Sequence, residues 1–557
     1  MAYFVTLLLS MYSTIALVPL LISAAATLKM IDQPGGRKVH TSPIPRVGGL
    51  AMILGAIPPV CLYTHLDHFS VVVLAGSAIL VLFAVLDDSI GLGYKTKFAG
   101  QIIAATIVVG WGGLSVPSSA ILPEAILAQP WIAYPLTLLV IVAVTNAVNL
   151  ADGLDGLAGG MMALVFICLA LLAGRSDAMF IAILSMAMVG AILGFLRFNT
   201  FPALVFMGDA GSQLLGFLGI VLTLALTQKA TTALSPLLPL LLFGFPVLDM
   251  AMVMFERIRR GVSPFRGDQN HFHHKLIRMG LSHAEAVLLL YAIQAVFVIL
   301  ACLFRFSSDW TVLGAFCVAA CLLPVPVYVL YGRGFQLRRK QQKAEAGCET
   351  DADAGLVKKK ILALRVSQGL IEYGLPALFL GAACLPCVVG PITGIVGLLV
   401  LGVLLASCGF KGSWSSVPLR MTVYLLLPLM FAHCRHSIGT WVSSVPFGLY
   451  AGCYGLVFFA AIAVLKLTRR QKGFRLTPTD FLIVFIVLLL FNLLGPVMDS
   501  GQLGMWVVLL IVFFFAFELL IGELRGEIVK LKIALVPGLV VLIARSGLWE
   551  ALQRWLL

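Results

Sequence analysis

The stretch WIAYPLTLLVIVAVTNAVNLADGLDGL, residues 131–157, decides the fold of this chain. It begins with an apolar run close to the ~20 residues that a helix needs to cross a bilayer. Four polar residues then recur at every third position: Asn146, Asn149, Asp152 and Asp155. On a continuing helix they would form one slowly drifting stripe, and Gly153 and Gly156 let the backbone turn closely around an ion or a phosphate. A helix cap would explain one aspartate, so the pattern indicates a spanning helix that ends in a functional site.

The rest of the chain repeats the apolar part of this pattern. It has 557 residues, of which 61% are hydrophobic and 11% charged, a composition typical of membrane proteins. Continuous runs favour helices, because barrel strands alternate over ~10 residues. We predict an all-α integral membrane protein, a polytopic bundle of about eleven transmembrane helices followed by a second bundle of about seven. The first eleven runs are 3–28, 47–64, 70–86, 98–113, 131–148, 157–173, 178–196, 211–227, 233–255, 284–304 and 310–331.

Lysine and arginine set the expected orientation. Up to the tenth run, the loops after odd-numbered runs carry thirteen of them and the loops after even-numbered runs only three. Basic loops stay in the cytoplasm, so the polar clusters belong at the cytoplasmic face of a multi-pass protein. The net charge of +13 is spread over short loops and is therefore a topology signal. We expect no nucleic-acid partner.

A charged stretch divides the chain into two membrane domains. Residues 336–365 mix lysines and arginines with acids and polar residues, which predicts a cytoplasmic linker. The domain before it, 1–335, holds every motif that suggests chemistry. The domain after it, 366–557, is a second helical bundle to which the sequence assigns no role.

Two more acidic motifs lie at the ends of apolar runs. Asp87 and Asp88 close the third run, where paired carboxylates need a matching cation, and Mg²⁺ often links carboxylates to phosphate. Lys95 and Lys97 follow and are candidate phosphate contacts. Asp209, in Met207-Gly-Asp-Ala-Gly-Ser, begins the eighth run and leaves room for a metal and a phosphate beside free backbone amides. Taken alone, these motifs also fit a solvated helix end and a simple N-cap.

Two basic loops complete the candidate site. One contains Arg266 and His271-Phe-His273-His274. We favour phosphate binding there over a zinc site, because no cysteine lies nearby, and we expect Asp249 to contact this loop and support it from behind the substrate-binding residues. The other joins the first two runs, and its cations suit an anionic substrate or a topology anchor. Its candidate binding residues are Arg37, Lys38, His40 and Arg46. The remaining histidines, His283 among them, are isolated in the sequence, and we expect them at surfaces or interfaces.

In this order, the motifs resemble the polyprenyl-phosphate N-acetylhexosamine-1-phosphate transferase superfamily, also called glycosyltransferase family 4. The resemblance covers roughly residues 1–335 and rests on Asp87-Asp88, the run at 146–156, Met-Gly-Asp-Ala-Gly-Ser at 207–212, and His-x-His-His at 271–274. The first loop, with Arg37-Lys38-x-His40 and Pro45-Arg46-x-Gly-Gly, looks like the WecA branch. Where the family has a basic residue after the aspartate of the histidine loop, this chain has Gln269, and Arg266 is the candidate substitute.

The resemblance implies a bacterial inner-membrane enzyme with a cytoplasmic active site. Such an enzyme transfers an N-acetylhexosamine-1-phosphate from a UDP-sugar, such as UDP-GlcNAc, to undecaprenyl phosphate, releases UMP and starts synthesis of a cell-surface polysaccharide. The implied cofactor is Mg²⁺, with Mn²⁺ as a substitute, held by Asp209 with Asp87 and Asp88. Asp152 and Asp155 join these three as catalytic residues. Asn146, Asn149, Lys95, Lys97, the first-loop cations, Arg266, His271, His273 and His274 are implied to bind substrate. Candidate protein partners are a second copy of the chain and downstream glycosyltransferases.

Two other functions remain open at this point. One is the phospho-MurNAc-pentapeptide transferase of peptidoglycan synthesis, although that branch has a different first loop. The other, from a different class, is an ion-coupled transporter. Transporters place polar residues near the middle of the membrane, in broken helices of paired repeats. Here the acids lie mostly at the ends of apolar runs, and no repeat is visible, so the sequence favours the enzyme.

Overall fold

The computed structural model describes residues 2–34, 43–116, 124–229, 234–263, 271–336, 354–384, 391–406 and 528–547, with short stretches and single residues from 419 to 520. Within them, seven helices are long and apolar enough to cross a membrane, and the one sheet has two strands of two residues each. The protein is therefore an all-α, multi-pass membrane protein, as predicted. The seven helices are His68–Ile90, Pro130–Ala151, Leu157–Arg175, Met179–Asn199, Gly208–Gln228, His283–Phe304 and Asp309–Gly332.

The chain divides into two compact units. In the first, the helices follow the order α1 (Ala2–Ala24), α2 (Gly48–Tyr63), α3 (His68–Ile90), α4 (Tyr94–Gly110), α5 (Glu124–Leu127), α6 (Pro130–Ala151), α7 (Leu157–Arg175), α8 (Met179–Asn199), α9 (Gly208–Lys229), α10 (Leu238–Leu242), α11 (Gly244–Arg259), α12 (Phe272–Arg278), α13 (His283–Phe304), α14 (Asp309–Leu322) and α15 (Pro324–Gly332). In the second, α16 (Ala354–Ala383) and α17 (Pro391–Ala406) both pack on α23 (Ile528–Arg545).

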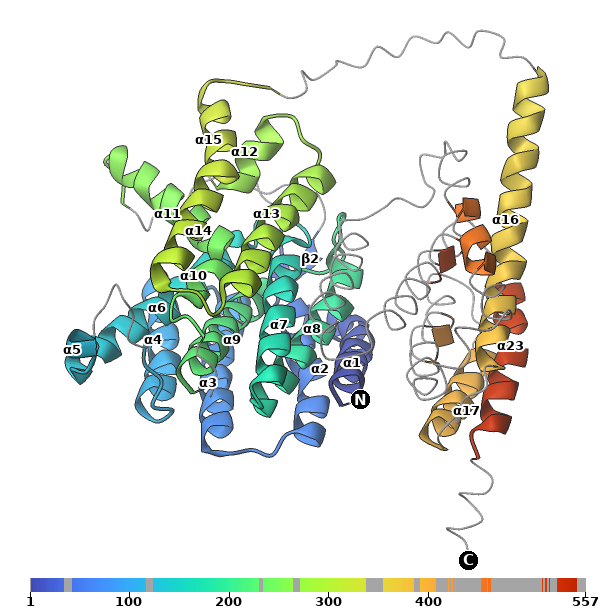
Figure 1. Cartoon of the computed structure of the whole chain (residues 1–557), viewed down its shortest axis with the longest axis horizontal. Helices are drawn as coiled ribbons and strands as arrows, with labels where there is room; N and C mark the ends of the chain where they lie inside the picture. Colours follow the sequence, from blue (N-terminus) through green and yellow to red (C-terminus); the bar gives the residue numbers. More distant parts are fainter. Residues whose placement is uncertain are drawn as a thin grey trace, which may run out of the picture. The chain divides into compact units, whose positions relative to one another are not determined.

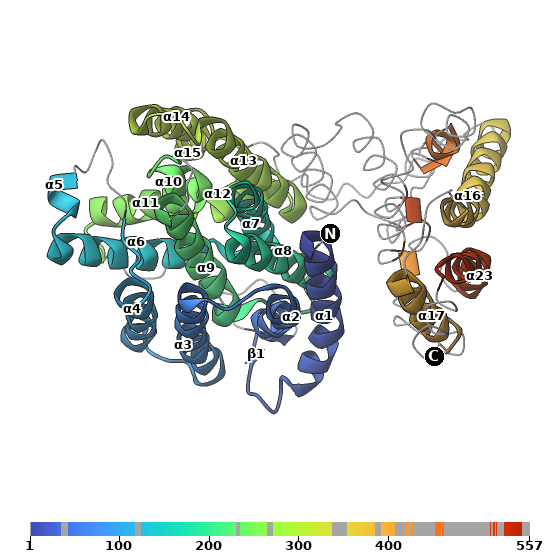
Figure 2. The same cartoon turned by 60° about the horizontal axis from the view of Figure 1, so that its bottom comes forward.

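Helix α9 forms the centre of the first unit (Figures 1 and 2). It packs against α2, α3, α6, α7 and α10, and its buried residues include Leu215, Ile220 and Leu222. A helix that is apolar around its whole circumference belongs in the core of a bundle. The residues at its N-terminus are therefore surrounded by the ends of neighbouring helices, and this enclosure positions the site.

The first loop is fastened to the segment that precedes α9. Strand β1 (Ile31–Asp32) pairs antiparallel with β2 (Ile44–Pro45), and the backbone N–H of Phe206 donates to the Pro45 carbonyl (2.7 Å). Helix α2 then starts with Gly48 and Gly49. A Cβ at Gly49 would lie 2.2 Å from the Gly211 nitrogen, so only glycine permits the contact between the starts of α2 and α9.

The ninth expected run, 233–255, is broken into α10 and α11. Pro246 has no N–H to donate to the carbonyl of Leu242, four residues earlier, so the helical ladder is interrupted there. Gln294 of α13 repairs the interruption: its Nε2 donates to the Leu242 carbonyl (2.7 Å), and its Oε1 accepts from the Phe245 N–H (3.3 Å). The eleventh run is likewise divided at Pro324, the first residue of α15.

We expect Gln294→Met to lower the stability of the protein by about 1–3 kcal/mol, because the substitution leaves a buried carbonyl and a buried N–H without partners. Thermal unfolding of the detergent-solubilised protein measures this loss. Leu303→Met, on an exposed part of the same helix, is the matched control and should unfold like the wild type. Equal unfolding temperatures for Gln294→Met and Leu303→Met would contradict the assignment.

Candidate functional site

Asp88 holds the N-terminus of α9. Its Oδ1 accepts from the N–H of Asp209 (3.1 Å), and its Oδ2 accepts from the N–H of Ala210 (3.0 Å). The first N–H groups of a helix have no partner within the helix, and a carboxylate there also interacts favourably with the helix dipole. Gly208 has φ +72°, and a Cβ on it would lie 2.6 Å from Asp88 Oδ2. Asp88 therefore acts as a cap supplied by α3.

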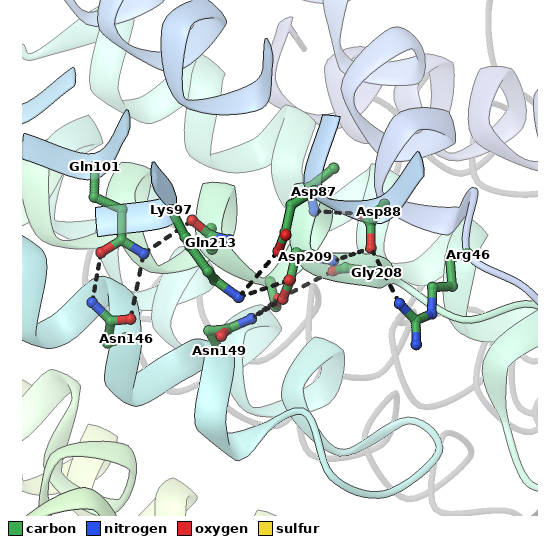
Figure 3. Close-up of polar contacts among 12 residues, drawn as sticks. Arg46, Asp87, Asp88, Lys97, Gln101, Asn146, Asn149, Gly208, Asp209 and Gln213 are labelled. Atoms are coloured by element: carbon green, nitrogen blue, oxygen red, sulfur yellow. Dashed lines mark hydrogen bonds and ion pairs between the residues drawn. The ribbon is translucent and has the colours of Figure 1, made fainter. Parts of the chain in front are cut away.

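Asp209 is the centre of the polar contacts (Figure 3). Lys97 Nζ lies 2.7 Å from its Oδ2, and Asn149 Nδ2 donates to its Oδ1 (2.7 Å). The Asp87 carboxyl lies 3.7 Å from the same Lys97 Nζ, so Asp87 and Asp209 share this lysine. Residues from α3, α4, α6 and α9 thus meet at one end of the bundle, with a single lysine between two carboxylates.

The first loop contributes Arg46 to this end of the bundle. Its guanidinium pairs with Asp32 and lies 4.0 Å from Asp88 Oδ1. Arg37, Lys38 and His40 lie outside the described residues. Lys95 is exposed, and it does not line the cavity described below.

The polar ladder is not a continuous helical stripe. Helix α6 ends at Ala151, so Asp152 and Asp155 lie in the turn to α7. The turn is held from outside: Asn199 Oδ1 accepts from the Gly156 N–H (2.8 Å), and Tyr291 donates its hydroxyl to the Gly156 carbonyl (2.5 Å).

Asp152 lies in the wall of the cavity beside other acids. Shielding from bulk water, together with the carboxylates of Asp209 and Asp155, raises the pKa of Asp152 to about 7. A carboxyl with this pKa is present in both protonation states near neutral pH, so Asp152 can either donate or accept a hydrogen bond there.

Asp249 of α11 holds the histidine motif in place through His271 and Phe272. Its carboxylate lies 3.0 Å from His271 Nδ1 and accepts from the Phe272 N–H (2.9 Å). His271 and His273 are buried, while His274 lines the cavity. Lys275 of α12 pairs with Glu256 of α11 (2.9 Å) and lies over the Tyr328 ring (3.9 Å), so α12 is fixed to α11 and α15. Arg266 lies outside the described residues.

A cavity of about 680 Å³ joins these elements. Its lining includes acids, among them Asp88, Asp152 and Asp209, and the rings of Phe201, His274 and His283. His283, which we expected only at a surface or interface, lines this cavity: its ring stacks on Phe201 (centroids 4.3 Å apart), and its Nε2 lies 3.3 Å from the Asp155 carbonyl. A single histidine after a helix cap gives no sequence signal of this position.

Two buried glutamines near the site, Gln101 and Gln213, were also not identified from the sequence. Gln101 Nε2 donates to Gln213 Oε1 (3.0 Å), and Asn146 Nδ2 donates to Gln101 Oε1 (2.6 Å). Asn146 is therefore engaged beneath the site, and it does not line the cavity. The spacing was a usable signal, because Gln101 and Gln213 each follow a site residue, Lys97 and Asp209, by four positions.

The donor chemistry at Asp209 fits a hard divalent cation. No group of three His, Cys, Asp or Glu in the described part of the chain is arranged to hold a metal. Mg²⁺, however, is usually bound through one or two carboxylates together with waters and substrate phosphates. Asp87 and Asp209 supply such a pair, whereas both oxygens of Asp88 are occupied by backbone N–H groups.

Asp87 and Asp88 should therefore respond differently to the same substitution. Without added metal, we expect Asp88→Asn to destabilise the protein by about 1–2 kcal/mol, because it weakens the cap of α9. Asp87→Asn should not destabilise it, because the substitution relieves repulsion between Asp87 and Asp209. Thermal unfolding of the two variants in detergent and EDTA makes the comparison. Equal losses of stability would show that Asp88 is not a cap.

His273 should make the protein sensitive to acid. Burial and the neighbouring His274 lower the pKa of His273 to about 3, whereas an unfolded histidine has a pKa of about 6.5. As the pH falls below ~6.5, the unfolded chain binds a proton that the native protein excludes, so the stability present above this pH is lost progressively towards pH ~3.

His273→Gln should therefore flatten the plot of unfolding temperature against pH between pH ~6.5 and ~4, with a change of up to ~1.4 kcal/mol per pH unit. His65→Gln, which replaces an exposed histidine, is the control and should keep the slope of the wild type. If His273→Gln also keeps that slope, His273 is not buried in its neutral form.

Comparisons with known proteins place this chain in a family. Residues 70–227 match the model of glycosyl transferase family 4. The chain is 35% identical to a probable undecaprenyl-phosphate N-acetylglucosaminyl 1-phosphate transferase of Bacillus subtilis (strain 168), over 55% of this chain and 86% of that protein. It is 38% identical to the decaprenyl-phosphate N-acetylglucosaminephosphotransferase of Mycolicibacterium smegmatis, over 47% and 72%. It is 32% identical to the undecaprenyl-phosphate alpha-N-acetylglucosaminyl 1-phosphate transferase of Escherichia coli (strain K12), over 53% and 83%. The chain therefore belongs to glycosyl transferase family 4, the polyprenyl-phosphate N-acetylhexosamine-1-phosphate transferases.

Proposed function

We propose that the protein transfers N-acetylglucosamine-1-phosphate, or a related N-acetylhexosamine-1-phosphate, from a UDP-sugar to undecaprenyl phosphate and releases UMP. The observation that carries this proposal is the meeting of Asp87, Lys97 and Asn149 with Asp209, because Asn149 and Asp209 line a cavity of about 680 Å³. The printed names of the relatives, which are N-acetylglucosaminyl phosphate transferases acting on polyprenyl phosphates, support the same substrates.

Asp87 and Asp209 are the residues we assign to Mg²⁺. The bound ion would neutralise the charge that develops on the pyrophosphate of the UDP-sugar. Lys97 now partly neutralises the two carboxylates, and an ammonium placed there can also contact a phosphate oxygen. Asn149 keeps Asp209 in one orientation, because its amide donates to both Asp209 Oδ1 and Ser212 Oγ (2.7 Å each).

The proposed reaction requires little acid–base catalysis by the protein. A phosphate monoester has a second pKa of ~6, so undecaprenyl phosphate is mostly a dianion at neutral pH. One of its oxygens attacks the β-phosphorus of the UDP-sugar, a P–O bond forms to the lipid phosphate, and the bond to the α-phosphate breaks to release UMP. Such transfers depend mainly on positioning and on charge stabilisation. Asp152, with its pKa of about 7, is the residue best suited to take up a proton from the remaining monoanion.

The cavity lining suits both parts of the nucleotide sugar. We place the phosphates beside Asp209, where Arg46 also lines the cavity. Phe201 and His283 offer flat surfaces for a ring. We place the uridine or sugar between these two rings and the turn that carries Asp155.

A membrane-surface site follows from the chemistry of the acceptor. Its polyprenyl tail stays in lipid, while its phosphate must meet a water-soluble nucleotide. The end of α6 and the starts of α4 and α9 carry the site residues, so the site lies at one end of the bundle. We propose that this end faces the cytoplasm, because the flanking loops carry most of the lysines and arginines.

The transfer can be tested by incubating detergent-solubilised protein with undecaprenyl phosphate, Mg²⁺ and radiolabelled UDP-GlcNAc, and by measuring the release of UMP. We expect Asp209→Asn and Asp87→Asn to lower single-turnover rates at least ~100-fold, because each removes charge that acts on the pyrophosphate. EDTA should abolish release by the wild type. Asp177→Asn, an exposed site in the turn between α7 and α8, is the control and should retain the wild-type rate.

Near-full UMP release by either site variant would remove that residue from the mechanism. Absence of release by the wild type with a panel of UDP-N-acetylhexosamines would contradict the proposed transfer. If only UDP-MurNAc-pentapeptide serves as donor, the protein is instead a phospho-MurNAc-pentapeptide transferase. Release by protein in detergent, without a sealed vesicle, argues against a transporter.

A further inference from the structure

Three amide side chains lie one helical turn beneath the site. Gln101 follows Lys97 by four residues on α4, Gln213 follows Asp209 by four residues on α9, and Asn146 precedes Asn149 by three residues on α6. Residues three or four apart share one face of a helix. Gln101, Asn146 and Gln213, here called the amide layer, therefore lie one helical turn deeper in the bundle than Lys97, Asn149 and Asp209, each to the left of the site residue on its own helix in Figure 3.

Within the amide layer, every hydrogen bond between helices runs from one side chain to another. Gln101 is at its centre: its Nε2 donates to Gln213 Oε1 (3.0 Å) and lies 3.3 Å from Asn146 Oδ1, and its Oε1 accepts from Asn146 Nδ2 (2.6 Å). Gln101 and Gln213 are 1% and 2% exposed, so water contributes little to satisfying them. Asn146 also donates to the Val142 carbonyl of its own helix (2.8 Å), which restrains its rotamer.

Packing alone does not explain these residues. Gln213 Nε2 is buried and has no hydrogen-bond partner among the described residues, and an unpaired buried donor is destabilising. A methionine or leucine would fill the same space without that penalty. A charged residue would pair more strongly, but it would alter the balance of charge around Asp209. An amide donates and accepts without adding charge, which suits a link beneath an acidic site.

We propose that Gln101, Asn146 and Gln213 are positioning residues, which fix the rotation of α4, α6 and α9 so that Lys97 and Asn149 reach Asp209. Hydrogen bonds between helices in apolar surroundings restrict how each helix turns about its axis. A small rotation of α4 would swing Lys97 away from Asp209, and the same rotation would break the contact of Gln101 with Gln213. The inference deepens the proposed function and rests on it.

The first experiment compares buried glutamines with the same chemistry at different places. Gln101→Met and Gln213→Met remove the amide layer, and Gln294→Met removes an equally buried glutamine that bonds α13 to the break between α10 and α11. For the layer variants we expect kcat per folded enzyme to fall roughly tenfold and the Mg²⁺ concentration for half-maximal rate to rise at least ~3-fold, with KM for UDP-GlcNAc within ~2-fold of wild type.

Gln294→Met should lose thermal stability but keep the wild-type kcat and Mg²⁺ dependence. A shift in Mg²⁺ dependence separates positioning from general damage, because a smaller folded fraction would lower the rate without changing the metal requirement. The double variant Gln101→Met/Gln213→Met should have a kcat no more than about twofold below that of the less active single variant, because both substitutions disrupt one unit. Wild-type kcat and Mg²⁺ dependence in both single variants, or the same changes in Gln294→Met, would overturn the proposal.

The second experiment does not use the reaction. A double-mutant cycle of Lys97→Met and Asp209→Asn, read by thermal unfolding in EDTA, measures the coupling between these two side chains. The coupling should be present in the wild type and in the Gln294→Met background, and it should be lost in the Gln101→Met background. Coupling that survives Gln101→Met would show that the amide layer does not position Lys97.

The two experiments separate the two ideas. A wild type that releases no UMP counts against the proposed function alone, and the double-mutant cycle then decides whether the amide layer positions Lys97. An active wild type with unaffected layer variants and intact coupling counts against the amide layer alone.

Discussion

The site depends on one interaction, the capping of a buried helix end by Asp88. Helix α9 is enclosed by its neighbours, and Met207, which precedes it, has no side-chain oxygen that could accept from its first N–H groups. Asp88 reaches them from α3. The capped residues, Asp209 and Ala210, include the acid on which the other polar side chains converge. The same contact therefore stabilises the helix and fixes the backbone from which Asp209 projects.

A cluster of acids at such a place is unfavourable by itself. Asp87 and Asp209 lie 3.7 Å and 2.7 Å from Lys97 Nζ, and this lysine offsets the repulsion between the two carboxylates. Charges with little solvent need a partner, and in this site the lysine holds the position that a metal and a substrate phosphate would share in the proposed reaction. The protein thus keeps concentrated negative charge at one helix end, and this charge is a reason for the site to bind cations.

Much of this arrangement was predictable from the sequence. Apolar runs of spanning length alternate with polar clusters. A chain that crosses a membrane back and forth must therefore gather the clusters that follow odd-numbered runs at one end of the bundle. The structure brings residues of α3, α4, α6 and α9 together at such an end. The roles of adjacent residues were not predictable. Successive side chains on a helix point about 100° apart, and sequence alone does not show that Asp88 faces α9 while Asp87 faces Lys97. His283 was missed because it reaches the cavity through tertiary packing, which leaves no periodic signal. The division of the run at 233–255 could have been read from Pro246, but its repair by Gln294 could not.

That repair links two positions far apart in the chain. The Leu242 carbonyl needs an outside donor only because residue 246 is a proline, and Gln294 is the side chain that supplies it. A residue with an N–H at position 246 could pair with that carbonyl within the helix, whereas proline cannot. The stability that Gln294 contributes is therefore tied to the residue at position 246, and the two positions act as one unit although they are 48 positions apart in the chain.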